Sequence, residues 1–229
     1  MSGGCLPRGV VFDCDGTIAD TESLSNRAWR QTLATYGYEP SSEDFDAVIG
    51  HPFPHNWDYF CARVDLGDQE RFRAALRERF IDLFDRELVL YPDAVTTIAD
   101  LHRAGVPIAV ASSSNHRHVE RVLERGALTS MVQAIVGADD VDRHKPHPQP
   151  YLTAAERIGV AAGHCSAVED TGVGLTAANA AGMFTIGIVR EHGSDDGLTS
   201  ADRVVHELTV DVLRPDARGP VGGTTPPRR

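Results

Sequence analysis

Lysine is almost absent from this sequence. Of its 22 basic residues, 21 are arginine and only Lys145 is lysine. Because the chain uses arginine wherever an ordinary positive charge suffices, a lone lysine indicates a position that requires a compact ammonium group and not a planar guanidinium. Lys145 is therefore a candidate functional residue before any motif is considered.

Long apolar runs and paired cysteines are also missing. No stretch approaches the roughly 20 apolar residues that span a bilayer, and residues 1–8 contain no apolar run that would mark a signal peptide. The cysteines form no Cys-x-x-Cys pair, which argues against a zinc or disulfide framework and for reduced thiols; they are Cys5, Cys14, Cys61 and Cys165. We expect a cytoplasmic protein that does not bind a membrane.

The charge balance is acidic, with 33 acidic against 22 basic residues and a formal net charge of -11. This excess argues against recognition of a nucleic-acid backbone, so any phosphate that the protein handles is expected to be bound locally and to belong to a small molecule. The 229 residues can form one large domain or a main domain with a smaller insert. We expect a monomer or a weak homodimer.

Short apolar runs alternate with helical patterns along most of the chain. This alternation is typical of an α/β fold with a Rossmann-like, doubly wound parallel sheet. Four helices are punctuated by a following glycine, and the first of them also has a proline at its start. The predicted strands are 9–12, 108–111, 134–137, 165–168 and 185–189, and the predicted helices are 92–104, 119–125, 151–158 and 175–181.

Residues 21–89 break this alternation. They show helical periodicity without a convincing strand, with aromatic stripes such as Trp29–Leu33–Tyr36 and Phe72–Leu76–Phe80–Phe84 that are typical of a buried helix face. The pattern predicts a small helical cap domain inserted into a core formed by residues 1–20 and 90–213. Residues 214–229, rich in proline, glycine and arginine, are expected to be disordered.

Polar side chains follow the predicted strands at their carboxyl ends. Asp13 and Asp15 come after the first strand, Ser112 after the second, and Glu169 and Asp170 after the fourth. The lone lysine follows the third strand after a short polar loop. Taken singly, each has an ordinary structural interpretation, as a turn or a helix cap. Together they are expected to meet at the sheet edge where open parallel sheets bind ligands.

Four segments in this order resemble the motifs of the haloacid dehalogenase superfamily, in the phosphatase and β-phosphoglucomutase-like branch with a helical C1 cap. The resemblance covers the chain from Val10 to about Leu213. The matching segments are Asp13-Cys14-Asp15-Gly16-Thr17, Ala111-Ser112-Ser113-Ser114, Lys145-Pro146-His147-Pro148 and Val168-Glu169-Asp170-Thr171, the last followed by Gly172-x-Gly174.

The resemblance implies a role for each matching residue. Asp13 would attack phosphorus and form an aspartyl-phosphate, and Asp15 would act as general acid and then general base. The substrate phosphate would be held by Ser112, Ser113 and Lys145. Carboxylates gathered around a phosphate require a hard, oxygen-preferring cation, and Mg²⁺ is the expected cofactor; the implied ligands are Asp13, the Asp15 backbone carbonyl, Asp170 and Glu169.

Within the superfamily, the second aspartate favours phosphorus chemistry over dehalogenation. A cap without lysine excludes the Schiff-base phosphonate hydrolases. A sugar phosphomutase shares the core motifs, but it carries a histidine early in the cap where this sequence reads Ser25. We therefore expect a phosphatase for a small phosphorylated metabolite, a sugar phosphate first, with a β-phosphoglucomutase-like mutase as the main alternative. A catalytically silent binding protein on the same fold is the less favoured third.

Four histidines stand outside this assignment. Two lie in the cap, His51 and His55, and two follow the second motif, His116 and His118. A lone histidine is more often structural or solvated than bound to a ligand, so none is taken as a site residue.

Overall fold

The computed structural model describes residues 5–48, 53–190 and 195–215. The chain divides into two compact units, Met1–Ile18 with Leu90–Arg229 (the core unit) and Ala19–Val89 (the helical unit). His51 and most of the tail expected to be disordered lie outside the described residues. In the part of the chain that the structure describes, no helix is long and apolar enough to cross a membrane.

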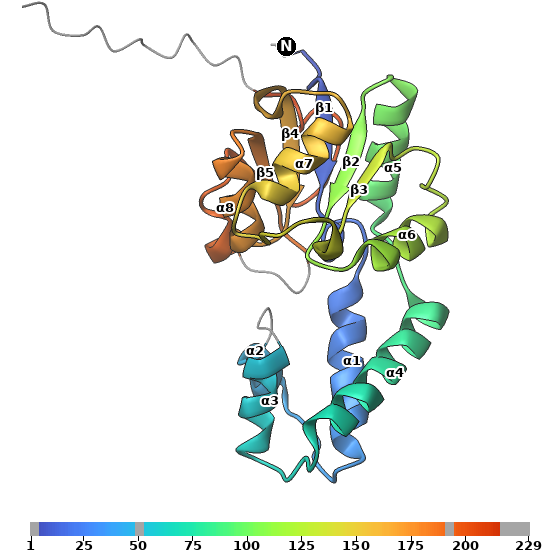
Figure 1. Ribbon diagram of the computed structural model, residues 1–229, viewed down its shortest axis with the longest axis vertical. Coiled ribbons are helices and arrows are strands. Elements are labelled where there is room, and N and C mark those ends of the chain that lie inside the picture. Colours follow the sequence, from blue (N-terminus) through green and yellow to red (C-terminus); the bar gives the residue numbers. More distant parts are fainter. Residues whose placement is uncertain (1–4, 49–52, 191–194, 216–229) are drawn as a thin grey trace, which may run out of the picture. The chain divides into compact units, whose positions relative to one another are not determined.

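The core unit contains a parallel sheet of six strands in the order β3-β2-β1-β4-β5-β6, which confirms the α/β, Rossmann-like prediction (Figure 1). The strands are β1 (Gly9–Phe12), β2 (Ile108–Ala111), β3 (Ala134–Val136), β4 (Cys165–Glu169), β5 (Phe184–Ile188) and β6 (Arg203–Val205). The sequence did not predict β6, because its three partly exposed residues at the sheet edge give no apolar run.

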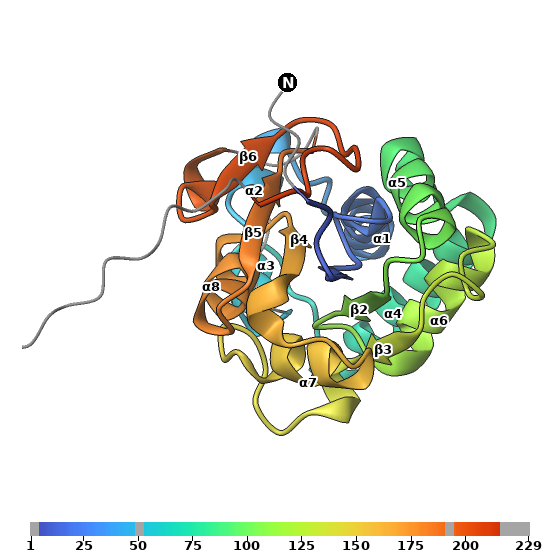
Figure 2. The same cartoon turned by 90° about the horizontal axis from the view of Figure 1, so that it is seen from above.

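Helices cover both faces of this sheet, which is why β1, β2, β4 and β5 are buried along their whole length and read as continuous apolar runs. Seen along the strands in Figure 2, α5 and α6 lie on one face and α7 and α8 on the other. The helices are α5 (Pro92–Arg103), α6 (His116–Arg125), α7 (Gln149–Arg157) and α8 (Gly172–Ala180). Short 3₁₀ turns cover Ala138–Asp140, Ala162–His164 and Asp195–Leu198.

The helix starts correct two structural interpretations of the sequence. The N-cap of α6 is Asn115, whose side chain accepts from the His118 amide, and the N-cap of α8 is Thr171, whose side chain accepts from the Gly174 amide. Neither Ser112 nor Asp170 is the N-cap of the helix that follows it, so the ordinary structural alternative does not apply to them.

The helical unit is built on an aromatic cluster. Its described residues form α1 (Thr21–Ala34), α2 (Ser42–Asp46), α3 (Phe53–Cys61) and α4 (Gln69–Glu87). The ring of Trp29 lies 5.7 Å from Phe53 and 5.4 Å from both Phe60 and Phe72, measured between ring centroids. The cluster packs α1 against α3 and α4.

Candidate active site

The candidate site lies where the strand order of the sheet reverses. From β1 the chain proceeds to β2 and β3 on one side, and β4 and β5 follow on the other. Phe12 pairs with Val168 across β1 and β4, so Asp13 and Glu169 emerge side by side at the carboxyl ends of these strands. The Asp13 amide donates to the Val168 carbonyl at 2.8 Å, which extends the pairing into the site. Crevices of this kind are the usual ligand sites of open α/β sheets.

A glycine brings the loop after β1 close to the loop after β4. Gly16 has φ +77°, and a Cβ atom there would lie 2.0 Å from Oδ2 of Asp170. Only glycine allows both this backbone conformation and this approach. The next residue, Thr17, is fully buried and donates from Oγ1 to Oδ1 of Asp170 at 3.4 Å.

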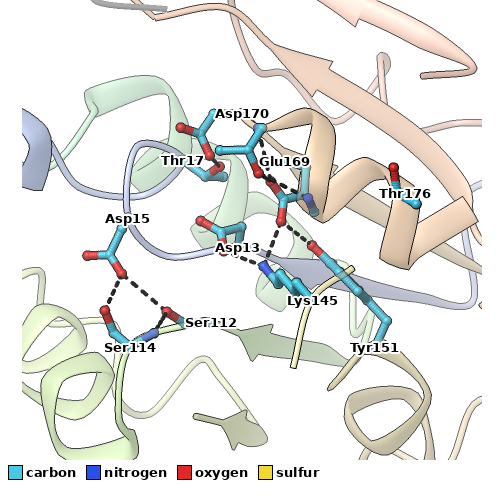
Figure 3. A network of polar contacts seen from close by, with 12 residues as sticks. Asp13, Asp15, Thr17, Ser112, Ser114, Lys145, Tyr151, Glu169, Asp170 and Thr176 are labelled. Carbon is cyan, nitrogen blue, oxygen red and sulfur yellow. Dashed lines mark hydrogen bonds and ion pairs between the residues drawn. The ribbon is translucent and has the colours of Figure 1, made fainter. Parts of the chain in front are cut away.

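Lys145 lies between two buried carboxylates. Its Nζ is 2.5 Å from Oδ1 of Asp13 and 2.6 Å from Oε1 of Glu169, and its side chain is 4% exposed (Figure 3). Burial alone would lower the pKa of Lys145, but the charges of Asp13 and Glu169 raise it well above its usual value. The lone lysine of the sequence is thus a permanent positive charge beside the first aspartate.

Glu169 is saturated with hydrogen bonds. Its Oε1 accepts from Lys145 and from the hydroxyl of Tyr151 at 2.8 Å, and its Oε2 accepts from the amide and the hydroxyl of Thr171 at 3.1 and 2.9 Å. A carboxylate offers about four lone-pair sites. All four therefore have a donor, and the geometry fixes Glu169 as the support of the lysine ammonium group.

Negative charge exceeds positive charge in this cluster. Asp13, Glu169 and Asp170 each present a carboxylate oxygen within 4.8 Å of the others, and among the described residues Lys145 is the cation that lies between them. Burial, followed by repulsion from Glu169, raises the pKa of Asp170 to about 8. Burial likewise raises the pKa of Asp13 well above its usual value, against the opposing effect of Lys145. The carboxylate oxygens of Asp13 and Asp170 fit a bound divalent cation, which would let both groups ionise.

Asp15 points away from Lys145, toward the loop after β2 (Figure 3). Its Oδ2 accepts from Ser112 Oγ at 3.2 Å and from Ser114 Oγ at 2.8 Å, and its Oδ1 lies 2.8 Å from His118 Nε2. Ser112 is buried and also accepts from the Ser114 amide at 2.9 Å. The second aspartate is therefore held by three side chains of the β2–α6 segment.

The structure thus gathers most of the predicted site residues in two adjacent groups. Asp13, Lys145, Glu169 and Asp170 form one, and Asp15 with Ser112 forms the other. Ser113 is exposed.

Four contacting residues were given no site role from the sequence, although Ser114 and Thr171 lie in the matching segments and His118 was considered. Ser114 and His118 hold Asp15, while Tyr151 and Thr171 hold Glu169. Ser114 stands in a serine run beside Ser112, and this neighbourhood is the signal that could have found it.

The remaining histidines differ from His118. His116 Nδ1 lies 2.7 Å from Asp140 Oδ2, a carboxylate that also accepts from the Gly137 amide at 2.8 Å. This contact ties α6 to the turn after β3, as a structural role requires. His55 is exposed on α3.

An α/β core with an acidic cluster at its switch point belongs to the class of open parallel sheets that bind a ligand at the carboxyl ends of their strands. The sequence matches the haloacid dehalogenase-like hydrolase family over residues 10–188. The chain belongs to this family and is a hydrolase, as the resemblance in its motifs predicted.

Similar proteins agree with this membership. Fructose-1-phosphate phosphatase YqaB of Escherichia coli (strain K12) is 31% identical over 182 residues, which cover 79% of this chain and 95% of that protein. Hexitol phosphatase A of the same strain is 30% identical over 88% of this chain and 91% of that protein. Among solved structures, one provisionally identified as a β-phosphoglucomutase from Thermotoga maritima superposes with a TM-score of 0.78 at 25% identity, covering 90% and 95% of the two chains.

Proposed function

We propose that this enzyme is a Mg²⁺-dependent phosphatase that hydrolyses a small phosphorylated metabolite, with sugar phosphates as the leading class, through an aspartyl-phosphate on Asp13. The observation that carries the proposal is the buried Asp13 carboxylate, held through one oxygen by the only lysine of the chain. The sugar-phosphate class is supported by the names of the two relatives. We place the enzyme in the cytoplasm.

The first step uses the oxygen of Asp13 that Lys145 does not hold. Since Nζ of Lys145 bonds to Oδ1, we assign Oδ2 as the atom that attacks phosphorus. The new bond joins Oδ2 to phosphorus while the ester bond breaks, and its electron pair leaves with the substrate oxygen. A positioned carboxylate divides a difficult hydrolysis into two easier steps.

Asp15 handles the proton in both steps. As general acid it protonates the leaving oxygen, and as general base it then takes a proton from the water that attacks the aspartyl-phosphate. Ser112, Ser114 and His118 hold it in the geometry described above. During the reaction the Asp15 side chain must rotate away from these partners toward the leaving group, and we propose that substrate binding triggers this rotation.

The donor set fits Mg²⁺. Asp13 and Asp170, with the backbone carbonyl of Asp15, are the residues that would hold it. Because both oxygens of Glu169 already have two donors each, we assign Glu169 to Lys145 and not to direct coordination. When bound, the ion supplies positive charge that offsets the carboxylates and the phosphate. Lys145, Ser112 and Ser113 would hold the remaining phosphoryl oxygens.

A screen for phosphate release over about a hundred phosphorylated metabolites, with Mg²⁺ present, tests the proposal; cap loops vary in function, and the screen assumes no particular substrate. We expect turnover of at least one sugar phosphate. No release from any ester would contradict the phosphatase and would revive the silent binding protein.

A β-phosphoglucomutase-like mutase is the second candidate, favoured by the likeness to the Thermotoga maritima structure. Incubation with β-glucose 1-phosphate and a sugar bisphosphate primer separates the two. The phosphatase releases inorganic phosphate. Isomerised product without free phosphate would overturn it.

A further inference from the structure

Arg190 is a largely buried arginine that lies two residues after β5 and outside the motifs. Its side chain is 10% exposed. Nη1 donates to Oδ2 of Asp93 at 2.8 Å, Nη2 donates to the backbone carbonyl of Thr17 at 2.9 Å, and the guanidinium carbon lies 3.9 Å from the centroid of the Tyr91 ring. One side chain that follows β5 therefore contacts both the loop after β1 and the start of α5.

These contacts lie where the core unit is interrupted in sequence. Thr17 and Ile18 end its first segment, and Leu90 and Tyr91 begin its second. The Tyr91 amide donates to the Ile18 carbonyl at 2.9 Å. Two consecutive carbonyls of the loop after β1 are thus held by residues outside that loop. Arg190 donates to the carbonyl of Thr17, and the Tyr91 amide donates to the carbonyl of Ile18.

The anionic partner of Arg190 is itself fixed. Oδ1 of Asp93 accepts from the Ala94 amide and Oδ2 also accepts from the Leu208 amide, both at 2.8 Å. Burial alone would raise the pKa of Asp93, but the hydrogen bonds from Arg190 and Leu208 and the charge of Arg190 lower it below its usual value. Asp93 is therefore a fixed carboxylate that orients the guanidinium.

One feature of the Arg190 side chain lowers the stability of the fold. Its Nε is buried and has no hydrogen-bond partner among the described residues, and a buried donor without a partner costs about 1–3 kcal/mol. Packing alone would be served as well by an apolar side chain. Proteins keep a buried donor without a hydrogen-bond partner mainly where function requires a particular geometry.

The carbonyl that Arg190 holds belongs to the residue whose hydroxyl reaches the candidate metal site. Thr17 Oγ1 donates to Oδ1 of Asp170 at 3.4 Å, and Gly16 beside it permits the close approach of Asp170. We propose that Arg190, oriented by Asp93, is a positioning residue that fixes the end of the Asp13–Thr17 loop and thereby the placement of Asp13 against Asp170. Its kinetic consequence rests on the proposed phosphatase function.

The chain offers a matched control. Arg203 on β6 also stacks over an aromatic ring, with its guanidinium carbon 5.4 Å from the centroid of Phe184, and it donates from Nη1 to the carbonyls of Val212 and Arg214 at 2.6 and 3.3 Å. Those acceptors lie outside the candidate site. Arg190→Ala and Arg203→Ala therefore remove similar interactions with different expected consequences.

Four measurements compare these variants with the unaltered protein. They are thermal unfolding, hydrogen exchange in the peptide of residues 13–18, half-saturation by Mg²⁺ followed as a shift in Tm, and kcat and KM with p-nitrophenyl phosphate. For Arg190→Ala we expect faster exchange in residues 13–18, weaker Mg²⁺ binding and kcat lowered about 10- to 100-fold, because small misplacements of reacting groups cost about that much. KM should change little, since the phosphate contacts remain. For Arg203→Ala we expect only lower Tm.

Chemical rescue sharpens the test. A hollow of about 570 Å³ is lined by Tyr91, Asp93 and Arg190 among others, so guanidinium ion can reach the space that Arg190→Ala leaves. Non-denaturing guanidinium should restore part of kcat in Arg190→Ala and none in Arg203→Ala. A purely structural arginine would not show this selective recovery.

Unchanged exchange in residues 13–18 and unchanged Mg²⁺ half-saturation in Arg190→Ala would overturn the inference, as would equal kinetic losses in the two variants. These results are distinct from failure of the proposed function. If the unaltered protein releases no phosphate, the phosphatase proposal fails, while hydrogen exchange still decides the role of Arg190. If Arg190→Ala does not fold, Arg190→Lys decides, because it keeps the charge and loses the second donor and the planar stack.

Discussion

Two aspartates, one in each unit of this protein, have opposite electrostatic environments. In the helical unit, Asp44 accepts from the amide and hydroxyl of Ser41 and from the hydroxyls of Tyr38 and Tyr59, and Arg63 lies 3.3 Å away. Burial alone would raise the pKa of Asp44, but these hydrogen bonds lower it. In the core unit, burial and neighbouring carboxylates raise the pKa of Asp170.

The difference separates a structural carboxylate from the candidate functional ones. Asp44 caps α2 and joins α2 to α3 with every oxygen occupied. Asp13 is also buried and Asp170 is partly exposed, and at both residues the effect of burial and neighbouring carboxylates on the pKa outweighs the opposing charge of Lys145. Perturbation of this kind concentrates at sites that bind a cation or perform chemistry. An uncompensated carboxylate cluster, more than burial itself, marks the site in this fold.

Asp13→Asn tests the functional side of the comparison with the largest expected effect. The amide has nearly the shape of the carboxylate but cannot attack phosphorus, so turnover should fall by more than about a thousandfold. Phosphate release under Mg²⁺ measures it. Asp44→Asn serves as the control, with kcat expected within about threefold of the unaltered enzyme once the folded fraction is counted. Near-normal turnover by Asp13→Asn would place the nucleophile elsewhere.

Lys145→Arg tests whether the compact ammonium group is required. The ammonium fits between Asp13 and Glu169 under the ring of Tyr151, and a planar guanidinium would displace one of them. We expect kcat to fall about 100-fold, as for loss of one electrostatic donor in an active site.

The converse substitution, Arg103→Lys, is the control for Lys145→Arg. Arg103 pairs with Asp100 at 2.9 Å and is 74% exposed, so its replacement should change stability by less than about 0.5 kcal/mol. If both variants were neutral, the scarcity of lysine in this chain would carry no information about the site.

Asp44→Asn tests the structural side. Asparagine cannot accept from all the donors that surround Asp44, so the free energy of unfolding should fall by about 1–3 kcal/mol. Both tryptophans of the chain, Trp29 and Trp57, lie in the helical unit, and their fluorescence during urea unfolding follows this unit. Stability equal to that of the unaltered protein would show that the hydrogen bonds of Asp44 contribute nothing.

The stability of the two units should depend on pH with opposite signs. This effect should be smaller than those of the substitutions above. A carboxyl group whose folded pKa is raised contributes stability at low pH that is lost as pH rises through that pKa, whereas a lowered pKa contributes stability above the unfolded value. Without metal, the protection of amides in β4 and α8, measured relative to the intrinsic exchange rate at each pH, should therefore fall between about pH 4 and 8, as Asp170 with its pKa of about 8 ionises. Mg²⁺ should slow this exchange.

The helical unit should respond in the opposite direction. Its stability, followed by tryptophan fluorescence, should decline only as pH falls below about 4, where Asp44 becomes protonated. Parallel pH profiles for the two units would remove the distinction between the two kinds of aspartate.

The strands and motif residues of the core unit could be predicted from the sequence, but the side-chain contacts that support the site could not. Continuous apolar runs predicted five of the six described strands, and the order of Asp13, Ser112, Lys145 and Glu169 along the chain predicted that they would meet at one edge. Tyr151 was read as the start of a helix, because no local pattern shows that its hydroxyl reaches Glu169 across 18 positions. The contact between Arg190 and Asp93 joins residues 97 positions apart and was not predicted for the same reason.

The central claim is that Asp13 carries a phosphoryl group during turnover. The most direct measurement is mass spectrometry of the protein quenched in acid during hydrolysis of p-nitrophenyl phosphate with Mg²⁺. We predict a species heavier by one phosphoryl group, located by digestion to the peptide that contains Asp13 and absent from Asp13→Asn. A phosphoryl group on any other residue, or turnover with no phosphorylated protein in a quench faster than a single turnover, would contradict the account.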